Sequence, residues 1–353
     1  MTRLILVWIF IFNHLIAYPQ LTVNDLKNSE TYIIHPNALK WDNKSLPFKN
    51  VVVIDNRFDT SKLGYKKVFS KYQKMKTTKG LAETIQQKIH TAIQNSMDTL
   101  SSGSLYIFIN HLWIQQTTNR ELSKRRISQP NTNYDTNFVS CNATIESYIL
   151  DKELFYPLLK IDSTISVMGV LWSQVDKSIS IPFQLLLDEL AAMDLNRKRK
   201  PVPSSVLSDH YKARLKYPIL NSDSYLKGVY LNYRDFLNNK VTYPFFEVEY
   251  GRVTDELYVV DNGNKRLQDK LWGFNDGENI FIKIGFNFFE LSRENFTYEL
   301  IGAKVLKQNA SLMKTNSGGD LFSLGIDNIR SERKIRISTY RPLQLNMDTG
   351  EPY

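Results

Sequence analysis

Apolar positions recur with a helical period in two stretches of the chain. In residues 81–97 an apolar side chain returns at every fourth position, which places these side chains on one face of a helix. Gly103 follows soon afterwards and ends the pattern. A second helix is predicted from Ser180, a candidate N-cap with Pro182 in the first turn, to Met193. Each helix therefore has one side that faces a core.

Short apolar runs and partial period-two alternation predict strands around the first helix. Val51–Ile54 is a buried-strand pattern, and a lysine-rich stretch from Lys62 to Lys79 separates it from the helix. Leu105–Ile109 predicts the next strand, and residues 138–149 and 158–170 predict two more because β-branched residues are enriched there. The order β-α-β-β-β-α predicts one sheet with two helices packed on it.

Beyond residue 203 the pattern changes to short strands rich in aromatic residues. One helical face is predicted over residues 229–237, and residues 246–250 alternate between apolar side chains and glutamates, as in a half-exposed strand. Asp276-Gly277 stands between two apolar runs and predicts a hairpin turn. Further strands are predicted at 286–291, 296–303, 321–324 and 334–338.

The predicted fold class is α+β, with an N-terminal sheet and two packed helices followed by a mostly antiparallel β-rich domain. Two domains are expected because single cores stop growing beyond about 250–300 residues. The charged run that ends in Pro201-Val202-Pro203 marks the boundary between them. In chain order the division is a signal peptide at 1–17, a leader at 18–46, the α+β domain at 47–200, a linker at 201–221 and the β-rich domain at 222–353.

The first residues have the layout of a secretory signal. Arg3 precedes an apolar run from Leu4 to Phe12, which is shorter than the roughly 20 residues that a membrane span requires. An uncleaved anchor is the competing interpretation, because Leu15 stands where a small residue is usual before the cleavage site. No later segment is apolar over 18 residues, so we expect a secreted chain without a transmembrane span after processing.

Charge and cysteine content bear on partners and compartment. The formal net charge is +9, which favours anionic partners. The candidate anion-binding residues lie in a polar stretch interpreted as an exposed loop, and they are Arg120, Lys124, Arg125 and Arg126. The competing interpretation is a solvated loop that has no partner. Cys141 is the single cysteine, and an exported chain without disulfides favours a bacterial periplasm or envelope surface over a eukaryotic secretory route. No nucleic-acid partner is predicted.

The sequence contains no local motif for catalysis, a metal or a cofactor. No two of its five histidines have metal-ligand spacing, and it has neither a Gly-x-Ser-x-Gly motif nor a glycine-rich phosphate loop. His111 follows a strand and could face a cleft, although a structural role is the preferred interpretation. Glu247 and Glu249 share one strand face, which we interpret as solvated. No catalytic, cofactor-binding or metal residue is therefore predicted.

Aromatic residues in the second half give the strongest signal for binding. Aromatic faces bind sugars and peptides, although such residues more commonly form the core of a small antiparallel domain. The candidates for an aromatic groove are Tyr230, Tyr233, Trp272 and Phe274.

Three segments carry a resemblance to known proteins. They resemble exported proteins common in Bacteroidetes-type bacteria. The segments are Gly228–Asn239, Leu271–Ile282, which has the sequence WGFNDGENIFI from residue 272, and Leu345–Glu351. That group has no assigned activity, so the resemblance implies a location and a C-terminal domain. The first domain is similar in element order to the α+β domains of envelope-transport auxiliary lipoproteins, although this chain lacks their N-terminal lipid cysteine.

The sequence favours a non-catalytic exported envelope protein that acts by binding a protein or an envelope component. The alternative is a hydrolase that acts on an envelope polymer, with its site in the cleft between the domains. An enzyme requires a pocket in which ionisable groups of shifted pKa converge, whereas a binding protein requires an exposed apolar or basic patch.

Overall fold

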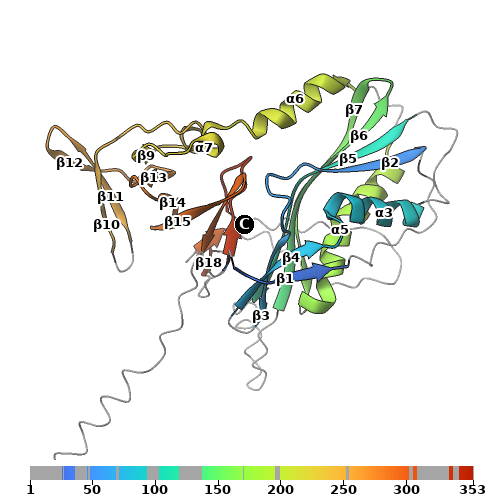
Figure 1. Ribbon diagram of the computed structural model, residues 1–353, viewed down its shortest axis with the longest axis horizontal. Helices are drawn as coiled ribbons and strands as arrows, with labels where there is room; N and C mark the ends of the chain where they lie inside the picture. Colours follow the sequence, from blue (N-terminus) through green and yellow to red (C-terminus); the bar gives the residue numbers. More distant parts are fainter. Residues whose placement is uncertain are drawn as a thin grey trace, which may run out of the picture.

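The computed structural model describes residues 26, 28–35, 46, 48–68, 71–93, 103–118, 137–169, 171–194, 199–251, 254–301, 305–307, 334–336 and 342–352. The chain is α+β, as predicted, with two sheet-based domains side by side and a helical connection between them (Figure 1). The predicted signal peptide and the candidate anion-binding residues lie outside the described residues. In the described part of the chain, no helix is long and apolar enough to cross a membrane.

The first domain contains an eight-stranded mixed sheet within the described residues. Its strand order is β1-β4-β3-β5-β6-β7-β8, and β2 also pairs with β5. Three long antiparallel strands form its centre: β5 (Ser104–Thr118), β6 (Asn137–Asp151) and β7 (Leu154–Met168). The shorter strands are β1 (Thr31–Ile34), β2 (Asn50–Asp55), β3 (Gly64–Val68), β4 (Lys71–Thr77) and β8 (Val202–Pro203).

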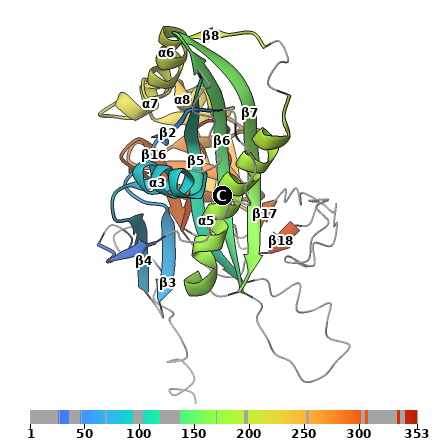
Figure 2. The same ribbon diagram turned by 90° about the vertical axis from the view of Figure 1, so that its right-hand side faces the viewer.

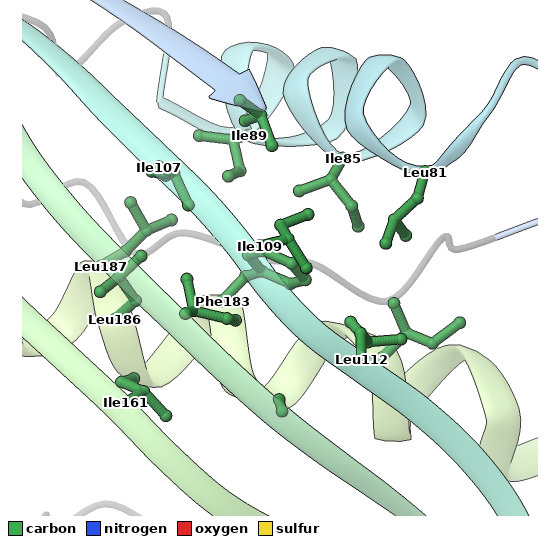
Figure 3. Packing of buried hydrophobic residues seen from close by; sticks show 14 of the residues in the cluster. Leu81, Ile85, Ile89, Ile107, Ile109, Leu112, Ile161, Phe183, Leu186 and Leu187 are labelled. Carbon is green, nitrogen blue, oxygen red and sulfur yellow. The ribbon is translucent and has the colours of Figure 1, made fainter. Parts of the chain in front are cut away.

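Helices α3 (Leu81–Ile93) and α5 (Leu171–Ala192) cover one side of this sheet (Figure 2). The apolar positions predicted for α3 are buried in the described part of the helix. Figure 3 shows Ile85 of α3 and Phe183 of α5 directed toward Ile109 of β5, all within one apolar cluster. Each such side chain contributes about 1.5–3 kcal/mol when it is fully buried, so this cluster is the main stabilising element of the first domain.

The start of the second helix was predicted wrongly. α5 begins at Leu171, nine residues before Ser180, and Pro182 lies inside the helix instead of in its first turn. Proline removes one backbone hydrogen bond from a helix interior. The buried side chains of Val175 and Ile179 continue the apolar face before the proline and hold these early turns against the sheet.

The lysine-rich stretch from Lys62 to Lys79 contains β3 and β4, which the periodicity did not predict. Lys62 and Lys66 are almost completely buried there. Lysine is rarely buried without a partner, so the many lysines of this stretch suggested that it is exposed to solvent. For Lys62, the partners are Asp59, three residues before it, and two glutamates of the second domain.

The second domain contains a six-stranded antiparallel sheet within the described residues, ordered β19-β16-β15-β14-β13-β9. Its strands are β9 (Gly228–Tyr230), β13 (Gly273–Asn275), β14 (Ile280–Ile284), β15 (Asn287–Glu294), β16 (Thr297–Ile301) and β19 (Pro342–Gln344). A separate three-stranded sheet consists of β10 (Phe246–Glu249), β11 (Glu256–Asp261) and β12 (Asn264–Leu267). Strands β17 (Val305–Lys307) and β18 (Lys334–Arg336) pair with each other.

The helical face predicted over 229–237 is correct only in its second part. Residues 228–230 form strand β9, and the helix α8 is limited to Tyr233–Leu237. Residues 228–230 are extended instead of helical because β9 pairs with β13. The Asn232 side chain accepts a hydrogen bond from the Asp235 amide at 3.0 Å and fixes the start of α8.

The hairpin predicted at Asp276-Gly277 joins β13 and β14. The Asp276 carboxylate accepts hydrogen bonds from the amides of Glu278 and Asn279 at 2.9 and 2.7 Å. Gly277 has φ +112°, a conformation that residues with a side chain rarely adopt. The strand predicted at 321–324 lies outside the described residues.

The segment 201–221, interpreted from sequence as a linker, forms helices α6 (Ser204–Arg214) and α7 (Pro218–Asn221). Leu207 and Tyr211 of α6 pack on the first sheet, on a cluster that includes Phe108. Ile219 and Leu220 of α7 belong to the core of the second domain. The connection therefore packs against both domains.

Candidate functional site

The two domains meet at a segment that leaves the first sheet. Strand β2 pairs in parallel with β5 as far as Asp55 and Ile109, and β3 resumes the pairing at Gly64 and Ile114. Residues 56–63, here called the joint segment, stand opposite only residues 110–113 of β5. The longer segment must therefore loop out of the sheet. β5 has a register irregularity at the same level, between Ile109 and His111.

Lys62 of the joint segment is the centre of a buried charge cluster. Its side chain is 1% exposed. Its Nζ atom lies 3.0 Å from an oxygen of Asp59, 2.8 Å from an oxygen of Glu299 and 3.7 Å from an oxygen of Glu294. The Tyr65 hydroxyl donates to the other oxygen of Glu299 at 2.8 Å. Both glutamates belong to the second domain, so the cluster is an ionic contact between the domains.

The protonation of this cluster follows from burial and from its charges. Burial acts to lower the pKa of Lys62, but the carboxylates of Glu299 and Asp59 outweigh it and hold that pKa above its ordinary value. Burial raises the pKa of Glu299 by more than Lys62 and the Tyr65 hydroxyl lower it. For Asp59, burial is outweighed by Lys62 and by hydrogen bonds from Ser61, so its pKa is lowered. Lys62 therefore stays charged, and its buried charge is stable only beside these carboxylates.

A second contact joins α6 to the C-terminal turn. The Arg214 guanidinium donates two hydrogen bonds to the Asp348 carboxylate, at 2.9 and 2.6 Å, in a bidentate arrangement. It also donates to the backbone oxygen of Asn56 at 3.3 Å and lies 4.5 Å from the centre of the Phe58 ring. Arg214 thus links the joint segment, the helical connection and the second domain.

A small crevice lies between these two contacts. Residues from both domains line it, among them Arg57, His111 and Asn346, and its volume of about 10 Å³ is the space of roughly one water molecule. Burial, and then the positive charges of Arg57 and Arg214, hold the pKa of His111 well below its usual range. The His111 imidazole is therefore neutral near pH 7. Ionisable groups therefore converge at the crevice, but its volume is too small for a polymer segment.

The candidate aromatic residues do not share one surface. Tyr230 is completely buried in the main core of the second domain, where Tyr233 and Trp272 pack with it around Phe236. Phe274 is buried in a different cluster, shared with the three-stranded sheet. Tyr233 and Trp272 are half-buried, and the Trp272 indole donates to the backbone oxygen of Gly350 at 3.3 Å.

The other residues considered for chemistry have structural surroundings. Glu247 is exposed and forms an ion pair with Lys265. Cys141 is buried in the first core, and burial raises the pKa of its thiol to about 12. Within the described residues, no group of three or more histidine, cysteine, aspartate or glutamate side chains could hold a metal ion.

The three-stranded sheet has an exposed face that includes apolar side chains. Its inner side, with Leu257 and Val259, packs on the second domain. On the outer side the register places Val260 beside Phe245 and Lys265, and Tyr258 beside Glu247 and Leu267. We call this set of six residues the outer face.

The two most exposed apolar side chains of the outer face are Phe245, at 71%, and Leu267, at 48%. Tyr258 and Val260 between them are half-buried. Figure 1 shows the three strands projecting at the end of the molecule opposite the first domain. Alternation in the sequence predicted strand β10, but alternation alone does not show which side of a strand stays exposed.

No protein-family model matches this chain, and comparison with curated proteins finds no match to it.

Proposed function

We propose that this chain is a non-catalytic exported protein of a bacterial envelope that binds a partner protein through the outer face. The observation that carries the proposal is the exposure of Phe245 and Leu267 beside Tyr258 and Val260, on adjacent strands of one small sheet. Exposed apolar side chains on one face, beside charged groups, are typical of interaction surfaces.

The composition of the outer face favours a protein over a polyanion. Val260 and Tyr258 lie at its centre. Phe245 and Leu267 stand at two opposite corners, and the charged pair Glu247 and Lys265 joins the other two. A protein interface uses such aromatic anchors for affinity and the surrounding charges for orientation. A polyanion would require a surplus of positive charge, which the outer face does not have.

The contact between the domains supports a role in positioning. A buried charge that loses its partner costs several kcal/mol, so Lys62 resists any movement that separates it from Glu299. This contact holds the second domain, on which the three-stranded sheet packs, against the first domain. Such fixed geometry suits a protein that presents a binding surface to a partner.

Export is the second part of the proposal. It is supported by the N-terminal layout of Arg3 and the apolar run that follows, and by the resemblance of three segments to exported Bacteroidetes-type proteins. The first domain's element order, similar to that of envelope-transport auxiliary lipoproteins, agrees with a periplasmic or peripheral envelope location.

Site-specific photocrosslinking in the native host tests the binding face. A photoreactive amino acid at position 245 or 267 is expected to give the same discrete adduct, and the same group at exposed Glu189 on α5 is the control position. Phe245→Ser should abolish co-purification of the crosslinked protein, whereas Phe296→Ser, a matched change at an exposed phenylalanine, should not. Equal adducts at all three positions, or none at 245 and 267, would refute the proposal.

A hydrolase that acts on an envelope polymer is the second candidate. The shifted pKa values of His111, which lines the crevice, and of Tyr65 and Glu299, in the charge cluster that shares Asp59 with it, favour this function because such groups are common at active sites. The domains would have to separate to admit a polymer. Release of soluble fragments from purified peptidoglycan by the chain, lost in Glu299→Gln, would favour this function over binding.

A further inference from the structure

Strand β7 forms an open edge of the first sheet in the described structure. One side of it pairs with β6 along its whole length. On the other side, β8 pairs only with Leu154 and Phe155. From Tyr156 to Met168 the outer edge of β7 has no strand partner among the described residues, and Figure 2 shows β7 as the outermost of the three long strands. Unpaired backbone groups at such an edge can accept another strand.

Two charged residues make this edge complementary to itself. Lys160 and Asp162 lie on the same side of the strand because they are two positions apart, and both are exposed. In an antiparallel pair of two β7 strands centred on Ile161, each Lys160 stands directly opposite the Asp162 of the other copy. A centre at residue 160 or 162 would instead place two like charges opposite each other. The charge pattern therefore selects one register.

The surroundings of the two charges fit this arrangement. The Lys160 side chain is 56% exposed and lies 3.3 Å from Glu146 of its own chain. Asp162 accepts a hydrogen bond from the Thr144 hydroxyl at 3.2 Å. Both charged groups are thus held on one side of the sheet by β6, while Ile161 is buried on the side covered by the helices.

We propose that β7 is a dimer interface, at which residues 156–166 of two copies of this chain pair antiparallel about a two-fold axis at Ile161. The paired segment begins at Tyr156 because β8 already pairs with the two residues before it, Leu154 and Phe155. The paired segment is roughly 37 Å long at about 3.4 Å per residue, and it joins the two sheets into one.

The protective features of this edge agree with a selective partner. Lysine, proline and an irregular register each discourage edge pairing, and β7 has Lys160, Pro157 and a register shift beside Tyr148. Pro157 and the shift lie at the end of the proposed segment, where they limit its length. Lys160 places a charge at the edge that an uncharged strand would leave unpaired, whereas a second copy places Asp162 opposite it.

The charges give a sharp test of the dimer. The purified chain is expected to dimerise in sedimentation velocity experiments. Lys160→Asp and Asp162→Lys should each raise the dimer dissociation constant about tenfold or more, because two attractive pairs become repulsive. The double variant K160D/D162K should dimerise as the unmodified chain does. An equimolar mixture of the two single variants should form a heterodimer, in which both pairs are again opposite in charge.

Controls separate this interface from other effects. Lys240→Asp makes the same charge change at an exposed loop of the second domain and should leave dimerisation unchanged. Circular dichroism of each variant reports whether it is folded. A chain that stays monomeric at all concentrations, or a dimer that neither single variant weakens, would overturn the proposal. Failure of the mixed variants to associate would also overturn it, and none of these results bears on the outer face.

Discussion

Lys62→Met is expected to destabilise the protein by about 3–5 kcal/mol at neutral pH, the usual cost of removing one partner from a buried ion pair. Methionine keeps most of the length of the lysine side chain, so most of the loss arises from the missing charge. The change leaves the carboxylates of Asp59 and Glu299, whose side chains are 1% and 4% exposed, without their positive partner.

The pH dependence of this loss has a definite sign. In the variant the charge of Lys62 no longer opposes burial, and only the hydrogen bonds from Ser61 to Asp59 and from Tyr65 to Glu299 remain. The folded-state pKa of Glu299 therefore rises further above its unfolded value of 4.5, and that of Asp59 rises as well. A carboxyl with a raised folded pKa contributes its stability below the unfolded pKa and loses it as the pH rises through the folded pKa. The difference between the variant and the unmodified chain is therefore largest at neutral pH and shrinks as the solution becomes acidic.

Urea unfolding, followed by tryptophan fluorescence and circular dichroism between about pH 4 and pH 8, measures this difference. Lys71→Met removes an exposed lysine from β4 and is the matched control, expected within about 0.5 kcal/mol of the unmodified chain. Adding Glu299→Gln to Lys62→Met should recover part of the loss at neutral pH. An unchanged midpoint, or a loss that grows toward acid pH, would show that Lys62 is not the neutralising charge of the contact.

Three further outcomes are expected from the sequence and the turn geometry. Gly277→Val should destabilise the second domain by more than about 1 kcal/mol in urea unfolding because φ is +112° there, and unchanged unfolding would contradict the assigned turn. Protein from the native host should lack its first seventeen to twenty residues by intact-mass measurement, whereas a mass that includes Met1–Ala17 would indicate an anchor. If the loop with Lys124, Arg125 and Arg126 binds anionic lipids, co-sedimentation with anionic vesicles should weaken with added salt and in a Lys124/Arg125/Arg126→Ala variant; equal pelleting by both proteins, or none by either, would exclude that loop from function.

Several elements of the fold could be predicted from the sequence because they depend on local geometry. The four-residue repeat beginning at Leu81 gives a helix face whatever lies opposite, since the backbone fixes that period. The hairpin at Gly277 follows from a residue that tolerates positive φ. Alternation predicted the strands β6 and β10 in the same way. Local geometry did not predict the start of α5. Pro182 suggested that the helix begins nearby, but the burial of Val175 and Ile179 extends the helix to residues before the proline.

The candidate sites depended on tertiary structure. In sequence, Lys62 is one of several charged residues in a lysine-rich stretch. Besides the nearby Asp59, its burial depends on Glu299, which the fold brings to it from the second domain. The exposure of Phe245 depends on which side of β10 the second domain covers. Periodicity is a property of neighbouring residues and is determined by the chain itself. Whether a charge is paired or an apolar side chain stays exposed is decided by segments distant in sequence, because desolvation depends on what the folded chain places against each residue.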